Sequence, residues 1–252
     1  MKKILATLVA FTCAFALMGC GGGAGSSTTA STAQTTDDGK KSEGVMTYAE
    51  YAAAAVDTEV TVETYVQAKQ SWWDNKGTFY TQDKDGAYFI YDMRCSKEEY
   101  DKLTEGTKIK VKGFKSEWEG EVEIIDATFE IKEGKFIASP VDVTDKLGTD
   151  DLVKFQNQKV SFKGLTVEKS NDAGDAFTYK YDGSGTQGDD IYFKVSKDGK
   201  TYSFTIRSYL TNKDTDVYKA AEALKVGQTI DVEGFLYWYQ GANPHITSIT
   251  VK

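Results

Sequence analysis

The sequence predicts a mainly β protein whose folded part consists of two similar five-stranded Greek-key barrels, each with a short helix between its third and fourth strands. Apolar and polar residues alternate over short segments that are separated by turn residues, which is typical of half-buried strands. One stretch also returns 121 positions later, so we expect a copied domain rather than a solenoid, whose units recur at roughly 20–50 residues. The repeated residues are Leu103, Gly106, Ile109, Val111, Gly113 and Phe114, which return as Leu224, Gly227, Ile230, Val232, Gly234 and Phe235.

Five strands and two helices are expected in the first copy, and each has a local reason. Val60 and Val62 alternate with polar residues, as in a strand with one buried face. Asp85-Gly86 between two apolar runs is a strong hairpin signal. Ser96 is followed three residues later by Glu99, which predicts a capping box. The expected elements are a helix from Thr47, strands at 60–65, 78–81, 87–93, 107–114 and 122–131, and a helix from Ser96 between the third and fourth strands.

The second copy repeats this order at greater length after a short linker at 132–140. Val160 and Phe162 correspond to the first strand of the first copy. The additional residues fall at 170–190 and 209–216, which we expect to be loops, because insertions in loops leave the order of core elements intact. In the repeated strand, Ile109, Val111 and Phe114 and their counterparts are expected to seal the core of each barrel.

The order of strands and helix is that of the OB-fold, a small, partly open Greek-key barrel. Each half resembles an OB-fold domain, and Gly-x-x-Ile-x-Val-x-Gly-Phe at 106–114 is similar to the anticodon-binding-like branch of that fold. As a whole, the chain resembles two-domain bacterial lipoproteins of the Firmicutes type. The resemblance covers 46–252 and implies a scaffold without naming an activity, because one fold supports many functions.

The N-terminal residues predict a lipoprotein signal. Lys2-Lys3 followed by the apolar run 4–17 is typical of a secretory signal and is too short to span a membrane. Leu17-Met18-Gly19-Cys20 resembles the bacterial lipobox, in which the cysteine is lipidated after cleavage, although Met18 is not the small residue usual at its position. We therefore expect Cys20 to anchor the protein to the cell membrane with its domains on the extracytoplasmic side. An ordinary secretory signal is the alternative.

A segment rich in Gly, Ser and Thr follows the signal and is expected to be a flexible tether. By random-coil scaling, a tether of this length should reach about 25–30 Å, enough to lift a folded domain off a membrane. The predicted organisation is a signal peptide at 1–19, the tether at 20–45, a first domain at 46–139 and a second domain at 140–252.

The charge of the chain disfavours general nucleic-acid binding. The net charge is −8, and binding to nucleic acid depends on neutralising phosphates. The one basic stripe in the sequence lies on the expected fourth strand, and we expect glutamates on the next strand to neutralise it. The lysines are Lys108, Lys110, Lys112 and Lys115, and the glutamates are Glu117, Glu119, Glu121 and Glu123.

Aromatic residues mark the expected ligand site. OB-folds usually bind across the second and third strands, between the loops that join strands one and two and strands four and five. Three of the four tryptophans are expected at this cleft of the first copy. Such rings could stack on bases, sugar rings or apolar peptide side chains, or could instead cap the open ends of a small barrel. The candidate ligand-binding residues are Trp72, Trp73, Tyr80, Tyr88, Tyr91 and Trp118 in the first copy and Tyr237, Trp238 and Tyr239 in the second.

Catalytic and metal-binding motifs are not evident in the sequence. His245 is the one histidine, so a His-based triad or a histidine metal cluster cannot be assembled within one chain. Cys95 is the one cysteine outside the signal and the lipobox, which excludes an internal disulfide. We therefore expect no enzyme activity, cofactor or metal. The acidic stretch 172–190 leaves calcium binding as an alternative to a flexible polar insertion, although it lacks EF-hand spacing.

These observations favour a non-catalytic, surface-anchored binding or scaffolding lipoprotein that uses an aromatic cleft for a glycan or a peptide. Single-stranded nucleic-acid binding at the cell surface is the second hypothesis. The third is a role in envelope assembly, in which the domains contact another envelope protein and no small ligand exists.

Overall fold

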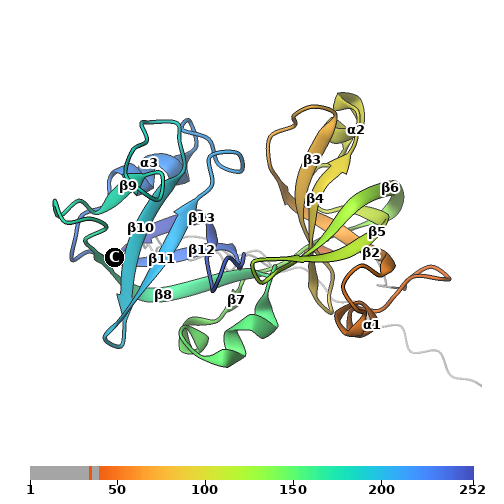
Figure 1. Cartoon of the computed structure of the whole chain (residues 1–252), viewed down its shortest axis with the longest axis horizontal. Coiled ribbons are helices and arrows are strands. Elements are labelled where there is room, and N and C mark those ends of the chain that lie inside the picture. The colour runs from red at the N-terminus through yellow and green to blue at the C-terminus, as the bar shows by residue number, and fades with distance from the viewer. Residues whose placement is uncertain (1–33, 36–39) are drawn as a thin grey trace, which may run out of the picture. The chain divides into compact units, whose positions relative to one another are not determined.

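The computed structural model describes residues 34–35 and 40–252, which belong to one compact unit (Figure 1). The predicted signal and the lipidation site at Cys20 lie outside the described residues. Within the described part of the chain, no helix has the length and apolarity needed to cross a membrane.

The first half of the chain forms a closed five-stranded barrel. Its strands pair in the order β2-β3-β4-β6-β5, and β5 pairs back to β2, which closes the ring. All neighbours are antiparallel except β4 and β6, which pair in parallel at Phe89 and Ile90. The elements are α1 (Tyr48–Ala53), β2 (Glu59–Lys69), β3 (Lys76–Gln82), β4 (Ala87–Arg94), α2 (Lys97–Lys102), β5 (Thr107–Trp118) and β6 (Glu121–Ile137), and the short β1 (Gln34–Thr35) pairs with β6.

The strands of the second half pair in the same sequence. The ring runs β8-β12-β13-β11-β10, and β10 pairs back to β8. Here β11 and β13 pair in parallel, at Thr205 and His245. The elements are β7 (Val141–Asp142), η1 (Thr144–Lys146), η2 (Asp150–Phe155), β8 (Lys159–Glu168), β9 (Phe177–Tyr179), β10 (Ile191–Lys197), β11 (Lys200–Ile206), α3 (Asp216–Glu222), β12 (Thr229–Phe235) and β13 (His245–Val251). The mainly β prediction is confirmed, and the closed ring is the OB-fold-like barrel that the strand order indicated.

Helix α1 closes one end of the first barrel. Tyr51 from this helix packs edge-on against Tyr88 inside the barrel, with ring centroids 4.9 Å apart. Lys115 caps the helix, because its Nζ donates to the carbonyl oxygens of Tyr51, Ala52 and Ala54 at 3.1, 2.9 and 2.7 Å. The last carbonyls of a helix lack partners within the helix, so this buried ammonium satisfies them and complements the helix dipole.

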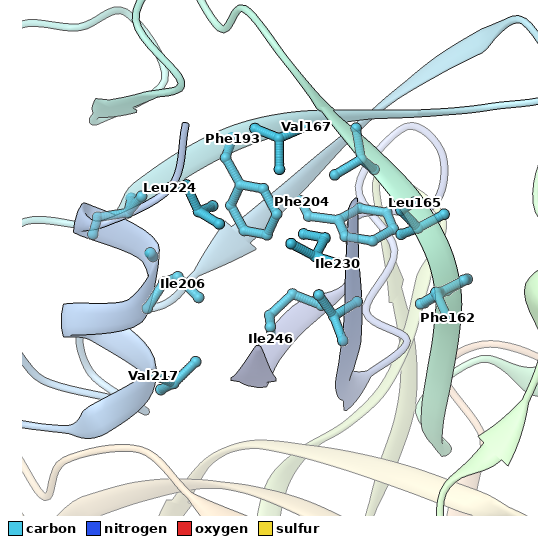
Figure 2. Close-up of a cluster of buried hydrophobic side chains, with 14 of the residues drawn as sticks. Phe162, Leu165, Val167, Phe193, Phe204, Ile206, Val217, Leu224, Ile230 and Ile246 are labelled. Carbon is cyan, nitrogen blue, oxygen red and sulfur yellow. The ribbon is translucent and has the colours of Figure 1, made fainter. Parts of the chain in front are cut away.

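Phenylalanines and aliphatic side chains fill the second barrel. Figure 2 shows Phe193, Phe204 and Ile230 pointing toward one another, and the ring centroids of Phe193 and Phe204 are 6.0 Å apart. Helix α3 covers this cluster with Val217 and Ala221. Alternate residues of β8, β10 and β12 are fully buried, as expected from strand periodicity.

The repeated strand seals each core with Ile109 and Val111 or their counterparts, but neither Phe114 nor Phe235 belongs to the core of its own barrel. Ile109 and Val111 are fully buried, whereas Phe114 is 42% exposed. The prediction that Phe114 seals the core is therefore wrong. Along β5, Ile109, Val111 and Gly113 are buried, whereas Lys112 and Phe114 are exposed, so ordinary strand alternation places Phe114 on the outer face.

Two lysines of the basic stripe pair with glutamates of β2 rather than with the expected glutamates at 117–123. Lys112 pairs with Glu59 at 3.1 Å and Lys108 with Glu63 at 3.6 Å, and both acids lie on β2. The glutamates at 117–123 lie beyond these lysines, where β5 turns into β6. The prediction that the glutamates at 117–123 neutralise the stripe is therefore wrong for Lys108 and Lys112, and the buried Lys115 is not available to a phosphate.

Part of the predicted tether is held against the first barrel. Lys41 Nζ donates to Asp83 Oδ2 at 2.6 Å, and the backbone N–H of Ser42 donates to Glu63 Oε2 at 3.2 Å. Both acids are buried, so residues 40–42 complete a polar network on the barrel wall. The boundary at residue 45 remains a prediction, but residues 34–35 and 40–42 are in contact with the barrel rather than free.

Candidate ligand-binding grooves

The β3–β4 face of the first barrel, where a ligand was expected, is covered by the second barrel. Tyr80 and Phe89 on this face form a buried cluster with Phe235 from the end of β12. The rings of Tyr80 and Phe235 stack with centroids 4.7 Å apart, and Phe89 meets Tyr237 edge-on at 5.3 Å. The second barrel therefore takes the position of a ligand on this face.

A hydrogen bond at the centre of the contact joins Tyr80 to His245. The distance from Tyr80 Oη to His245 Nδ1 is 2.6 Å, and Gln70 Nε2 donates to the same hydroxyl at 3.0 Å. Burial, and secondarily the charge of Arg207, lowers the pKa of His245 to about 3. Burial also raises the pKa of Tyr80. The pair is therefore neutral, and the tautomer of the imidazole decides which of the two groups donates.

Two of the predicted ligand-binding tyrosines are buried, and for these the prediction is wrong. Tyr88 is 0% exposed inside the barrel, between the rings of Tyr48 and Tyr51. Tyr80 points outward as strand alternation requires, but the stack with Phe235 leaves it 1% exposed. Alternation along a strand shows which side chains point into the barrel and which point out of it. It does not show whether a second domain covers the outer face.

Trp72, Trp73 and Tyr91 line an open groove of about 400 Å³ that is completed by Arg207 and Tyr209 from the second barrel. We call it the Trp73 groove. Trp73 is 73% exposed, Tyr209 60% and Tyr91 47%. Three large aromatic faces at one site on the surface are typical of a binding site, because soluble proteins rarely expose contiguous apolar patches of this kind.

A tight turn presents Trp73 to this groove. Trp73 and Lys76 exchange backbone hydrogen bonds of 3.1 and 2.9 Å, and the two residues between them, Asp74 and Asn75, have φ of 48° and 58°. Asp and Asn tolerate this left-handed conformation, as a hairpin turn of this kind requires. Trp72, by contrast, is half-buried, and its Nε1 donates to the Cys95 carbonyl at 3.0 Å.

Tyr209 is held beside this turn by the backbone. The N–H of Ser71 donates to the Tyr209 carbonyl at 2.7 Å, and the Ser71 hydroxyl donates to the same oxygen at 3.2 Å. The guanidinium of Arg207 lies 5.6 Å from the centroid of the Tyr209 ring. The groove is therefore built by residues from both barrels, and Tyr209 lies in a region that the sequence showed only as an insertion.

The charges in the Trp73 groove are balanced. Arg207 pairs with Asp190 at 2.5 Å, and Lys76 pairs with Asp92 at 3.3 Å. Asp190 also accepts from the backbone N–H and the hydroxyl of Ser208. Because each cation already faces a carboxylate, the groove has no excess of positive charge.

The corresponding face of the second barrel, formed by β10 and β11, is open. Tyr181, Tyr192 and Tyr239 line a groove of about 330 Å³ on it, together with Lys194 and Asn243. We call it the Tyr181 groove. Tyr181 is 82% exposed and Tyr239 43%. Tyr239 was predicted as a ligand-binding residue, whereas Tyr181 and Tyr192 were not. Tyr181 lies in the Asp- and Gly-rich insertion that was predicted to be a polar loop.

The predicted convergence of three tryptophans is wrong. Trp118 lies instead against Tyr239 of the second barrel, with ring centroids 5.2 Å apart, and it is 53% exposed. Trp238 is half-buried over Gly120, where a Cβ atom would come within 2.8 Å of its ring. Tyr237 stacks on His245 at 4.3 Å. These aromatic residues serve the contact between the barrels, and Tyr239 alone among the three predicted from the second copy lines a groove.

Side chains with catalytic or metal-binding chemistry are engaged in structural contacts. Within residues 34–35 and 40–252, no group of three or more His, Cys, Asp or Glu side chains is placed to hold a metal ion. In the acidic stretch 172–190, the Asp175 carboxylate accepts from the Asn171 amide at 2.8 Å, and the Asp182 carboxylate accepts from the Ser184 backbone N–H at 3.0 Å. Burial raises the pKa of the Cys95 thiol to about 11, so it is protonated and unreactive at neutral pH.

Comparison with known proteins gives distant likenesses. No protein-family model and no curated protein matches the chain. The crystal structure of the tetrameric p202 HIN2 domain is 12% identical with a TM-score of 0.32, and the match covers 78% of this chain and 95% of that one. A murine DNA-binding protein bound to double-stranded DNA is 10% identical with a TM-score of 0.34, covering 76% and 94%. A deletion mutant of the single-stranded DNA-binding protein from Thermus aquaticus is 13% identical with a TM-score of 0.26, covering 77% and 93%.

Proposed function

We propose that this protein is a non-catalytic binding lipoprotein with two OB-fold-like domains, at 46–139 and 140–252, and that it holds a glycan in the Trp73 groove. Cys20 anchors it to the cell membrane, with the domains on the extracytoplasmic side. The observation that carries this proposal is the exposure of Trp73, Tyr91 and Tyr209 around one groove whose cations are already paired.

The chemistry of the groove suits the ring of a sugar. Aromatic faces pack against the apolar face of a pyranose, while polar side chains at the edge fix its hydroxyl groups. Gln70 and Thr78 supply amide and hydroxyl groups to the groove. Asp92 and Lys76 can exchange part of their ion pair for hydrogen bonds to the ligand, because a surface pair of this kind contributes little to stability.

Single-stranded nucleic acid is the second candidate, since bases stack on aromatic side chains and Arg207 and Lys76 lie beside these rings. Some solved structures of similar arrangement are described as DNA-bound, but their likeness is too distant to select a ligand. The net charge of −8 and the pairing of both cations disfavour a phosphate chain. A ligand that is neutral along its length fits the groove better.

An array of glycans and oligonucleotides, probed with the full chain, tests the proposal. We expect glycan binding by the unaltered chain. The affinity should fall by roughly tenfold or more in Trp73→Ala and in Tyr209→Ala, because each variant removes one stacking face. Tyr181→Ala is the matched control, since it removes an exposed aromatic ring outside this groove. Oligonucleotide binding with a steep inverse salt dependence would instead support the second candidate. Binding to neither class would favour the assembly role.

A further inference from the structure

Glu121 is a buried carboxyl at the contact between the two barrels. It is the first residue of β6, is 0% exposed, and lies beside the loop that follows β12. Its Oε2 accepts from the Trp238 backbone N–H at 2.8 Å and from Gln156 Nε2 at 3.2 Å. Both donors belong to the second half of the chain, so this carboxyl is a point at which the second barrel is attached to the first.

Two buried oxygen atoms at this point lack donors. Glu121 Oε1 and Asn157 Oδ1 have no hydrogen-bond partner among residues 34–35 and 40–252. The Asn157 amide cannot be reversed without loss, because its Nδ2 already donates to the Val122 carbonyl at 2.9 Å. The Asn157 side chain interacts with the Glu121 carboxyl, and this interaction by itself lowers the pKa of that carboxyl against the larger effect of burial. Unsatisfied buried acceptors are costly, and here a single proton on the carboxyl would supply the missing donor.

We propose that Glu121 is protonated in the folded protein and that its hydroxyl donates to Asn157 Oδ1, forming a carboxyl–amide latch between the barrels that opens when the proton is lost. In the protonated form, Oε2 keeps its two donors and Oε1 becomes a donor itself. In the ionised form, a buried negative charge remains at this contact while Oε1 still lacks a donor, which weakens the contact.

The surroundings of Glu121 favour the protonated form. Burial is the largest cause and raises its pKa to about 8, because it outweighs the Trp238 N–H and the Asn157 and Gln156 side chains, which lower the pKa. The charge of Glu123 on the same strand adds a smaller rise. Burial also raises the pKa of Glu123 to about 7, with Asp92 adding to the shift. The remaining titratable groups that interact with this carboxyl are tyrosines from the elements packed against it: Tyr51 of α1, Tyr80 of β3 and Tyr237 after β12.

The stability of the folded protein should decrease as the pH rises, because folding raises the pKa of Glu121. A carboxyl whose pKa is raised on folding binds its proton more tightly in the folded state, so stability falls as pH rises from the usual value of 4.5 toward 8. The latch is therefore closed at acidic and neutral pH and opens in mildly alkaline solution. Because Trp238 is adjacent to Tyr239, opening also disturbs the Trp118–Tyr239 pair and the edge of the Tyr181 groove.

Carbon-13 NMR of the full chain with labelled glutamate side chains tests the protonation directly. We expect one carboxyl resonance with a midpoint near pH 8, assigned by its absence in Glu121→Gln. If every glutamate resonance titrates below about pH 6, the proposal is wrong. This measurement uses the unaltered protein, so it does not depend on whether a variant folds.

Thermal unfolding tests the latch itself. We expect the Tm of the unaltered protein to fall by about 5–10 °C between pH 6 and pH 9. Glu121→Gln presents an amide donor to Asn157 and should keep the pH 6 Tm while losing most of this decline. Glu117→Gln, an exposed glutamate near the same hairpin, is the control and should retain the full decline. A Glu121→Gln variant that declines as steeply as the control would overturn the latch.

Discussion

The second and third strands of each barrel form the same face of the fold, but the two faces have different roles. On the first barrel, β3 and β4 carry Tyr80 and Phe89 into a buried contact. On the second, β10 and β11 carry Tyr192 into an open groove. Both faces display aromatic residues, so composition does not separate a binding surface from a docking surface. What separates them is the loop after β12, which extends from the second barrel onto the first.

The repeated strand shows the same difference at a single position. Phe114 and Phe235 occupy equivalent places in the repeat, yet Phe114 is 42% exposed and Phe235 is 2% exposed. The burial of Phe235 comes from its stack on Tyr80 of the other barrel. A duplicated residue can thus become an interdomain contact in one copy and remain on the surface in the other.

The largest effect is expected when this contact is removed. Phe235→Ala should lower the free energy of unfolding by about 3–5 kcal/mol, because removing a buried ring leaves a cavity beside Tyr80. The next residue in the chain, Leu236, is also buried. Phe114→Ala is the matched variant in the other copy and should cost less than about 1 kcal/mol. Denaturant unfolding of both measures the difference. Equal losses would mean that the two positions are not distinguished by docking.

A smaller loss is expected from the hydroxyl of Tyr80 alone. Tyr80→Phe leaves the buried His245 Nδ1 without its hydrogen-bond partner and Gln70 without its acceptor, so the free energy of unfolding should fall by about 1–3 kcal/mol. Tyr91→Phe removes a hydroxyl from a half-exposed ring and should change stability by less than about 0.5 kcal/mol. A neutral result for Tyr80→Phe would contradict the importance of the hydrogen bond.

The hairpin glycines of the two barrels give a third comparison. At Gly86 a Cβ atom would lie 2.3 Å from the Tyr48 ring, whereas at Gly199 it would meet nothing within 4 Å, although φ there is +76°. Gly86→Ala should displace α1 and cost about 1–3 kcal/mol. Gly199→Ala should cost about 1 kcal/mol from backbone strain alone. Their thermal unfolding midpoints test this order, and a larger loss at Gly199 would mean that α1 adjusts freely.

Much of each barrel could be predicted from local patterns. Ser96 and Glu99 form the expected capping box, and Ile109 and Val111 are buried as alternation requires. These signals depend on contacts between residues a few positions apart, or on one buried face of a strand. The order of the strands and helices in each barrel therefore follows from hydrophobic periodicity and turn residues.

The candidate site could be predicted only in part, because it is made by contacts between distant segments. Trp73 was found from its loop, but Arg207 and Tyr209 reach the same groove from the other barrel. Tyr80 was expected to be accessible, and Phe235 covers it. Nothing near Tyr80 in the sequence indicates a partner 155 positions further along the chain, so docking has to be observed.

The smallest effect on stability is expected in the grooves, where it also decides which face binds. Trp73→Ala and Tyr181→Ala should each change the free energy of unfolding by less than about 0.5 kcal/mol, because both rings are largely exposed. Glycan affinity should fall in Trp73→Ala and stay unchanged in Tyr181→Ala, as titration calorimetry would measure. The reverse pattern would place the ligand on the open β10–β11 face.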